Sequence, residues 1–287
     1  MKKIFLLLLL PLLAMALYSC SMEEGAKSGG DGNTKLVKTV RIQEFYDGKP
    51  IRDGAYWTSE LFYDDQRRLT RIREGYGENG RPYIGDGEDY IPAIIYGSNS
   101  IIIGWTNYYT DNNGYVTKIE QEGEFTRYVL IEYSNGYMAK ATYSFSNRWS
   151  TRSGVNSYTW ENGNCTKMNF YSEHNDPPYY GIINNYGLTL TYGNVVNKMN
   201  VELWYIGNNG GIADYGLEQY NFGFFTNFGL KGMKSKNLPI SVAYNDDPDH
   251  ETFSYTFDSE GYPIQIITNY NDSYDPGRYL RFTITYY

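Results

Sequence analysis

The chain has 287 residues, among them 32 tyrosines, 13 phenylalanines and 5 tryptophans. Its 33 acidic side chains outnumber its 25 basic ones, which gives a formal net charge of −8 at pH 7. Nucleic-acid binding depends on a clustered basic face. An acidic chain with scattered lysines and arginines does not offer one, so we expect no nucleic-acid partner.

The first 19 residues are typical of a lipoprotein signal peptide. Met1-Lys2-Lys3 precedes an apolar run that ends at Tyr18, shorter than the about 20 residues of a membrane-spanning helix. The segment Leu17-Tyr18-Ser19-Cys20 resembles a bacterial lipobox, which implies cleavage before Cys20 and lipid attachment to its thiol. Two or more acyl chains anchor a protein stably to a membrane. The alternative is an ordinary signal peptide followed by a chance cysteine.

Residues 20–34 are predicted to be the lipidated cysteine and a flexible tether, because glycine, serine and charge dominate them. Glu23 and Glu24 resemble the surface-export signal of Bacteroidota lipoproteins, which implies the outer membrane and its outer surface; retention on the inner leaflet is the alternative.

Cleavage before Cys20 would also change the charge and the thiol content of the chain. It removes Lys2 and Lys3, so the mature chain has 33 acidic and 23 basic side chains and a net charge of −10. With Cys20 acylated, Cys165 is the remaining thiol, which excludes an intramolecular disulfide.

Residues 35–287 are predicted to form a single all-β domain. Polar and apolar residues alternate along 137–146, with Tyr137, Ala139, Ala141, Tyr143 and Phe145 on one face. The final strand alternates in the same way, with Leu280, Phe282, Ile284 and Tyr286 on one face. Such alternation indicates antiparallel strands with one packed and one wet face.

Turn signals separate these runs, and helical periodicity is nearly absent. Asn-Gly pairs stand at residues 79–80, 113–114, 135–136 and 162–163, and this pair favours type I′ hairpin turns. The segment from Gly211 to Asn237 is the best candidate for a helix or an irregular insert, although glycine interrupts it often. The spread of tyrosine along the whole chain favours a structural role in half-buried strands; a glycan-stacking surface is the alternative.

An irregular repeat runs through the domain, in which an aromatic residue leads into a polar turn and then a strand with a base and an apolar residue. The units begin at Tyr63, Tyr109, Tyr133, Tyr158 and Tyr255. In the second unit Val116 and Ile119 would point to opposite faces of an unbroken strand, so either a bulge intervenes or both faces are partly buried. Uneven spacing argues against a strict solenoid.

These residues also carry a family resemblance. The units look like the tyrosine–aspartate hairpins of bacterial surface shells, but they are too few and too irregular for such a shell. The lipoprotein start, the segment 232–239 (GMKSKNLP) and the segment 255–263 (YTFDSEGYP) resemble a Bacteroidota lipoprotein family of unknown function with a porin-like fold. The resemblance implies a meander of antiparallel hairpins curled into a barrel-like sheet. It implies no activity.

The sequence shows no catalytic grouping and predicts no cofactor. Two histidines, His174 and His250, stand 76 residues apart, and zinc-binding motifs are missing. The oxygen-rich runs 245–251 and 269–275 could hold calcium, but solvated turns are the simpler interpretation. The acid pair Glu88-Asp89 would serve a glycosidase only if two carboxyls lay about 5–9 Å apart in space.

We therefore expect a non-catalytic, lipid-anchored surface protein that binds a glycan or a peptide through residues that the sequence does not single out. The alternatives are a glycan-cleaving hydrolase and a structural or assembly subunit of the outer membrane. We also expect a barrel that faces water and does not span the membrane, because the apolar rows are short and Lys140 and Arg281 interrupt the alternation.

Overall fold

The computed structural model describes residues 34–51, 55–78, 81–83, 94–121, 123, 125–148, 150–175, 181–200, 232–244, 250–270 and 277–287. The signal peptide, the tether up to residue 33 and the expected insert up to residue 231 therefore lie outside the described residues. So do the Asn79-Gly80 turn and Glu88-Asp89. Every element within the described ranges is a strand, as the sequence predicts. No helix in this part of the chain is long and apolar enough to cross a membrane.

The strands are β1 (Val37–Tyr46), β2 (Lys49–Pro50), β3 (Tyr56–Tyr63), β4 (Leu69–Glu78), β5 (Arg81–Tyr83), β6 (Ile94–Tyr96), β7 (Ser100–Ile103), β8 (Thr106–Thr110), β9 (Val116–Gln121), β10 (Phe125–Ser134), β11 (Tyr137–Asn147), β12 (Thr151–Glu161), β13 (Asn164–His174), β14 (Gly181–Val196), β15 (Asn237–Tyr244), β16 (His250–Phe257), β17 (Pro263–Tyr270) and β18 (Arg278–Tyr286).

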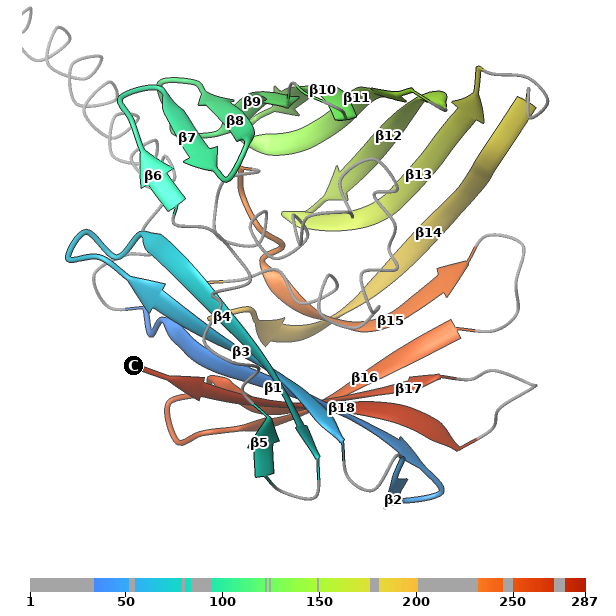
Figure 1. Ribbon diagram of the computed structural model, residues 1–287. Coiled ribbons are helices and arrows are strands. Elements are labelled where there is room, and N and C mark those ends of the chain that lie inside the picture. The colour runs from blue at the N-terminus through green and yellow to red at the C-terminus, as the bar shows by residue number, and fades with distance from the viewer. Residues whose placement is uncertain are drawn as a thin grey trace, which may run out of the picture.

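They form one antiparallel sheet of 18 strands that curls into a nearly closed barrel. From β6 to β18 each strand pairs with the next along the chain, and β18 then pairs with β1. The sheet continues from β1 to β3, β4 and β5, while β2 pairs with the end of β1. Figure 1 shows how this curl brings β6 back toward β4. The predicted barrel-like meander of hairpins is confirmed.

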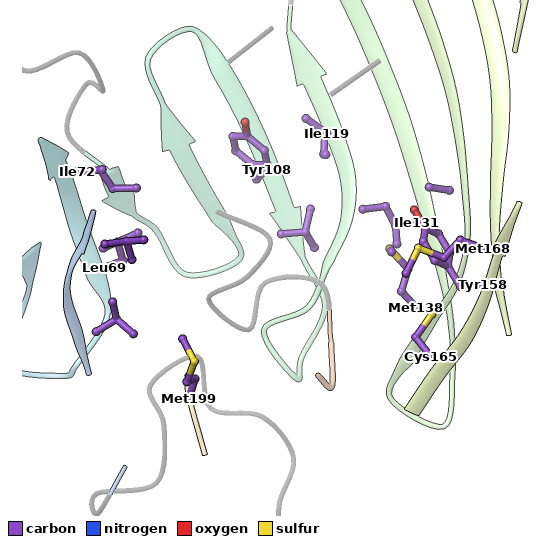
Figure 2. Packing of buried hydrophobic residues seen from close by; sticks show 14 of the residues in the cluster. Leu69, Ile72, Tyr108, Ile119, Ile131, Met138, Tyr158, Cys165, Met168 and Met199 are labelled. Atoms are coloured by element: carbon purple, nitrogen blue, oxygen red, sulfur yellow. The ribbon is translucent and has the colours of Figure 1, made fainter. Parts of the chain in front are cut away.

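The inward face of the sheet carries an apolar core. Its fully buried side chains come from both walls, for example Leu61 and Ile72 on β3 and β4 and Ile119 on β9. In Figure 2, Leu69 and Ile72 on one wall and Ile119 and Ile131 on the other point into the space between the strands. At about 25 cal/mol per Å² of buried apolar area, burial of each such side chain stabilises the fold by about 1.5–3 kcal/mol.

The predicted alternation is confirmed in the last strand and corrected in β11. Leu280, Phe282 and Ile284 are buried, as expected. In β11, a register shift between Glu132 and Tyr133 of β10 leaves Ala139 without an opposite residue, so the pattern changes face there. Met138 is buried in place of Tyr137 and Ala139. Beyond this bulge the prediction holds, because Ala141 and Tyr143 face the core.

A bulge also resolves the question of Val116 and Ile119. Tyr109 pairs with Lys118 and Thr110 pairs with Val116, so Thr117 is the extra residue. Val116 and Ile119 are both buried as a result. A bulge of this kind turns the side chains that follow it to the opposite face.

Aromatic side chains connect neighbouring strands at one end of the barrel, and we call these contacts aromatic latches. In each latch a half-buried aromatic residue lies near the end of one strand. Its tyrosine hydroxyl, or the indole N–H of Trp160, donates a hydrogen bond to a main-chain carbonyl near the start of the neighbouring strand. The pairs are Tyr63 to Val37, Tyr96 to Leu69, Tyr133 to Val116, Trp160 to Met138, Tyr192 to Cys165, Tyr255 to Pro239 and Tyr286 to Pro263. Six of the 32 tyrosines make latches, which gives those residues a structural role. The latches also correct the repeat, because Trp160 and not Tyr158 makes the latch in its unit, and Tyr109 points outward instead.

The turns at this end are of two kinds. Asn135-Gly136 and Asn162-Gly163 have positive φ at both residues, which confirms type I′ turns there. Asn113-Gly114 does not, because only Gly114 has positive φ. In that turn the side chain of Asp111 accepts hydrogen bonds from the main-chain N–H groups of Asn113 and Tyr115. Asp64 and Asp258 organise the same five-residue turn, which the Asn-Gly signal does not reveal.

The described chain begins at this latched end. Lys35 Nζ lies 2.9 Å from Asp258 Oδ2 and 2.5 Å from Glu260 Oε1. Its main-chain N–H donates to the hydroxyl of Tyr262, and the carbonyl of Leu36 accepts from the N–H of Tyr287. The point where the tether is expected to join is thus fixed to the β16–β17 turn.

Candidate functional site

The site residues suggested by the sequence mostly fall outside the described part of the chain. Cys20, Glu23 and Glu24 do so, as do residues 245–249 and 271–275 of the two oxygen-rich loops. Cys165 is buried and forms no disulfide within the described part of the chain, and its N–H donates to the hydroxyl of Ser235. Among the described residues no group of three or more His, Cys, Asp or Glu side chains could hold a metal ion.

The outward face of β8 to β13 gathers exposed tyrosines, and we call it the tyrosine face. Cross-strand pairing lines up two rows of outward residues around this wall. The first row is Tyr109, Lys118, Leu130, Thr142, Val155 and Tyr171, and the second is Asn107, Glu120, Tyr128, Ser144, Ser153 and Glu173. The first row alternates rings or apolar groups with polar ones as far as Val155, and the second row holds the ring of Tyr128 among polar side chains.

Three tyrosines of this face present their rings to solvent. Tyr109 is 37% exposed, Tyr128 36% and Tyr171 37%. They lie on β8, β10 and β13 respectively, so they are about 10 and 14 Å apart at the usual spacing of 4.8 Å between strands. The tyrosine face is thus a broad platform that would contact an extended ligand across several strands.

Charged groups between the rings are held in fixed positions. Lys118 Nζ lies 2.5 Å from Glu120 Oε1 and 5.0 and 5.4 Å from the ring centroids of Tyr109 and Tyr128. The hydrogen bond to Glu120 raises the pKa of Lys118, and the same bond lowers the pKa of Glu120. Both groups are therefore ionised at neutral pH.

The far side of the tyrosine face is organised in the same manner. The hydroxyl of Tyr171 donates to Glu173 Oε2 at 3.0 Å, and this bond raises the pKa of Tyr171. Ser153 Oγ lies 3.5 Å from Glu173 Oε1 and accepts from the side-chain amide of Asn175. Ring faces, carboxylates and an amide together suit a ligand that has both apolar faces and hydroxyl or amide groups.

A second outward face, on β18, β1, β3 and β4, carries arginines stacked on aromatic rings. It includes Arg41 over Tyr56, Arg281 over Phe45, and Arg71 and Arg73 over Phe62. We call it the arginine face. Neither face could be located from the sequence, because each is assembled by pairing between residues far apart in the chain.

Comparison with known proteins bears on the fold alone. No protein-family model matches the chain, and no curated protein matches it. A solved porin-like protein from Bacteroides uniformis shares the fold with a TM-score of 0.62 and 11% identity, over 88% of this chain and 99% of that one. A porin-like protein from Bacteroides vulgatus has a TM-score of 0.57 and 14% identity over the same shares of the two chains.

Proposed function

We propose that this chain is a lipid-anchored, non-catalytic protein of the outer membrane, displayed on the cell surface, whose tyrosine face binds a glycan or a peptide. The observation that carries the proposal is the alignment of Tyr109, Tyr128 and Tyr171 on one outward wall with polar side chains between them. A tyrosine ring offers a large rigid surface and a hydroxyl at little entropic cost, which suits such contacts.

The distribution of charge supports a barrel that faces water. Lys118, Glu120 and Glu173 point outward from β9 and β13. A charged side chain on the lipid-facing wall of a membrane barrel costs about 2–4 kcal/mol at the bilayer midplane for a base, and less for an acid. Arginines on the opposite wall would add to that cost. The likeness to porin-like proteins of Bacteroides supports an association with the outer membrane, for which the anchor at Cys20 provides the means.

The arrangement of carboxylates supports binding in preference to hydrolysis. A glycosidase needs two carboxyl groups about 5–9 Å apart. Glu120 and Glu173, the carboxylates of the two outward rows, lie on β9 and β13, four strand spacings or about 19 Å apart across the sheet. Glu120 also forms an ion pair with Lys118, and Glu173 accepts hydrogen bonds from Tyr171 and Ser153.

A glycan and peptide array probed with the full-length chain, purified in mild detergent, tests the binding proposal. Tyr109→Ala combined with Tyr171→Ala should abolish the strongest signals, whereas Tyr46→Ala should leave them intact. Tyr46 is a fitting control, because it is 41% exposed and lies on β1, away from the tyrosine face. An array without signals, or equal loss in both variants, would contradict the proposal.

Two variants test the lipid anchor and the display on the cell surface. Cys20→Ala should move the protein into the aqueous phase of a detergent partition, while the parent chain stays in the detergent phase. Protease treatment of intact cells should degrade the parent chain and spare a variant with Glu23→Ala and Glu24→Ala. Equal partitioning would remove the anchor from the proposal, and equal protection would remove surface display.

One observation favours assembly with another protein as a second candidate. Trp105, in the turn between β7 and β8, is 85% exposed, and Ile95 and Ile102 pair on the adjacent outward face at 57% and 37% exposure. An apolar group of this kind on a surface often marks a protein contact. Trp105→Ser should then release a co-purifying partner from gently solubilised membranes without affecting array binding.

A further inference from the structure

The arginine face concentrates positive charge in an acidic chain. The described outward positions of β18, β1, β3 and β4 hold four arginines, Arg41, Arg71, Arg73 and Arg281, and a single acid, Glu60. The chain as a whole has a net charge of −8. This wall is therefore locally cationic, and it is separated in the sheet from the acid-bearing tyrosine face.

Each guanidinium group is held against an aromatic ring. The Cζ atom of Arg41 lies 3.6 Å from the ring centroid of Tyr56, and that of Arg281 lies 4.2 Å from Phe45. Phe45 in turn stacks on Tyr279 with centroids 4.9 Å apart and an interplanar angle of 3°. A stacked guanidinium uses its flat side for the ring and keeps its N–H edges for in-plane hydrogen bonds.

Gly77 makes room for the closest of these stacks, that of Arg41 on Tyr56. Gly77 of β4 pairs with Tyr56 of β3, and a Cβ atom at Gly77 would lie 2.2 Å from Cζ of Tyr56. The ring of Tyr56 therefore lies flat over the backbone of β4, with Arg41 on the ring. Arg41 Nε is buried and has no hydrogen-bond partner within the described chain, so this arginine is positioned by stacking and not by a carboxylate.

Two further arginines are oriented by polar partners on the same face. Arg73 Nη2 lies 3.3 Å from Glu60 Oε2, and Arg281 Nη2 donates to Gln43 Oε1 at 2.8 Å. Arg281, Arg41 and Arg73 lie on β18, β1 and β4, which spreads them over three strand spacings, or about 14 Å. An anion that engages all of them must be extended and must carry repeated charges.

Hydroxyl groups fill the positions between the arginines. Thr39, Thr58, Thr283 and Thr285 share the outward face, and the hydroxyl oxygens of Thr39 and Thr285 are 2.7 Å apart. The main-chain groups of β18, β1 and β3 are used in ladders on both sides of each strand. A peptide would therefore find no strand edge on β18, β1 or β3 to pair with, while a polymer that carries hydroxyls would find partners there.

We propose that the arginine face binds an acidic polysaccharide that bears carboxylates along its chain. Guanidinium groups recognise carboxylates by paired N–H donors, and the threonine hydroxyls serve the sugar hydroxyls between the charges. The opposite sign of this face and of the polymer supplies the attraction. This site is separate from the tyrosine face and does not rest on the function proposed for it.

Polygalacturonate is a suitable probe, with its fully methyl-esterified form as the uncharged control. The full-length chain, purified in mild detergent, should bind polygalacturonate and not the ester. Arg41→Gln combined with Arg73→Gln should weaken binding about tenfold or more, which corresponds to the loss of one good charged contact. It should also reduce the dependence of binding on salt. Lys140→Gln combined with Lys167→Gln removes the same charge from β11 and β13 and should change the dissociation constant less than about twofold.

The arms of the experiment separate this proposal from its competitors. Equal binding of acid and ester, or equal weakening in the two double variants, would overturn it. Tighter binding of polyglutamate, or of vesicles with anionic lipid, would assign the face to a peptide or a membrane instead. If the glutamine variant does not fold, Arg41→Lys with Arg73→Lys keeps the charge but not the paired donors, and it should still weaken binding measurably. Tyr109→Ala should leave polygalacturonate binding unchanged.

Discussion

Tyr96 offers the sharpest test of how the barrel closes. No ladder joins β4 and β6 within the described residues, yet the hydroxyl of Tyr96 on β6 donates to the carbonyl of Leu69 on β4 at 2.8 Å. The guanidinium of Arg68 covers the same ring at 4.5 Å, and burial raises the pKa of Tyr96 to about 12. Among the described residues, this latch therefore bridges the gap between β4 and β6, which we call the seam, without a neighbouring backbone ladder.

Tyr96→Phe removes the hydroxyl and keeps the ring. The loss of one buried hydrogen bond, with its carbonyl left unsatisfied, should cost about 1–2 kcal/mol. An equilibrium constant changes tenfold for every 1.4 kcal/mol, so opening of the seam should become about 5–30-fold more frequent. Amide hydrogen exchange resolved by residue should then accelerate by that factor in β6 and β7.

Tyr133→Phe is the matched control. Tyr133 makes the same bond to Val116, but β9 and β10 are also joined by a backbone ladder. Its loss should lower the global stability in urea by a similar amount without selective exchange in those two strands. Closure by the latch would be refuted if Tyr96→Phe left β6 and β7 as protected as before, or if both variants accelerated exchange evenly along the chain.

Three further outcomes are expected. Gly154→Ala should destabilise the fold by about 1–3 kcal/mol in a urea titration, because its Cβ would lie 2.3 Å from the ring of Tyr143 and 2.5 Å from the carbonyl of Tyr171; a change below 0.5 kcal/mol would show that the rings move freely. The hydrogen bond from Lys35 lowers the pKa of Asp258 to about 2, so its contribution to stability is complete above about pH 5 and lost as pH falls through 2. Asp258→Asn should therefore lower the melting temperature at pH 6 and converge with the parent chain near pH 2; a constant difference would contradict this. The full-length Cys20→Ala variant should stay monomeric and rich in β-structure without detergent, and folding only in micelles would instead indicate a membrane pore.

The sequence predicts the strands better than it predicts their faces. The alternation in the last strand and the turns at the Asn-Gly pairs 135–136 and 162–163 depend on local geometry, so the sequence alone predicts them. Single extra residues at Thr117 and Ala139 reverse the pattern within a strand, and a bulge leaves no reliable trace in composition. The repeat predicts polar turns after Tyr63 and Tyr255 but not their geometry, because the side chains of Asp64 and Asp258 organise these turns without an Asn-Gly pair.

The two candidate faces could not be predicted, for a reason of register. Tyr109 and Tyr171 share a row only because five successive strand pairings align them. Arg281 and Gln43 are neighbours across 238 positions of sequence. A shift of one residue in any intervening pair would send one set of side chains inward, and a single sequence does not fix that register.

The aromatic latches also bear on how such a barrel can change over time. Each latch ties the end of one strand to the start of the strand beside it, and five of the seven join two strands that are consecutive in the chain. Adding or deleting such a strand pair would alter the circumference while leaving the hydrogen bonds of the other latches intact.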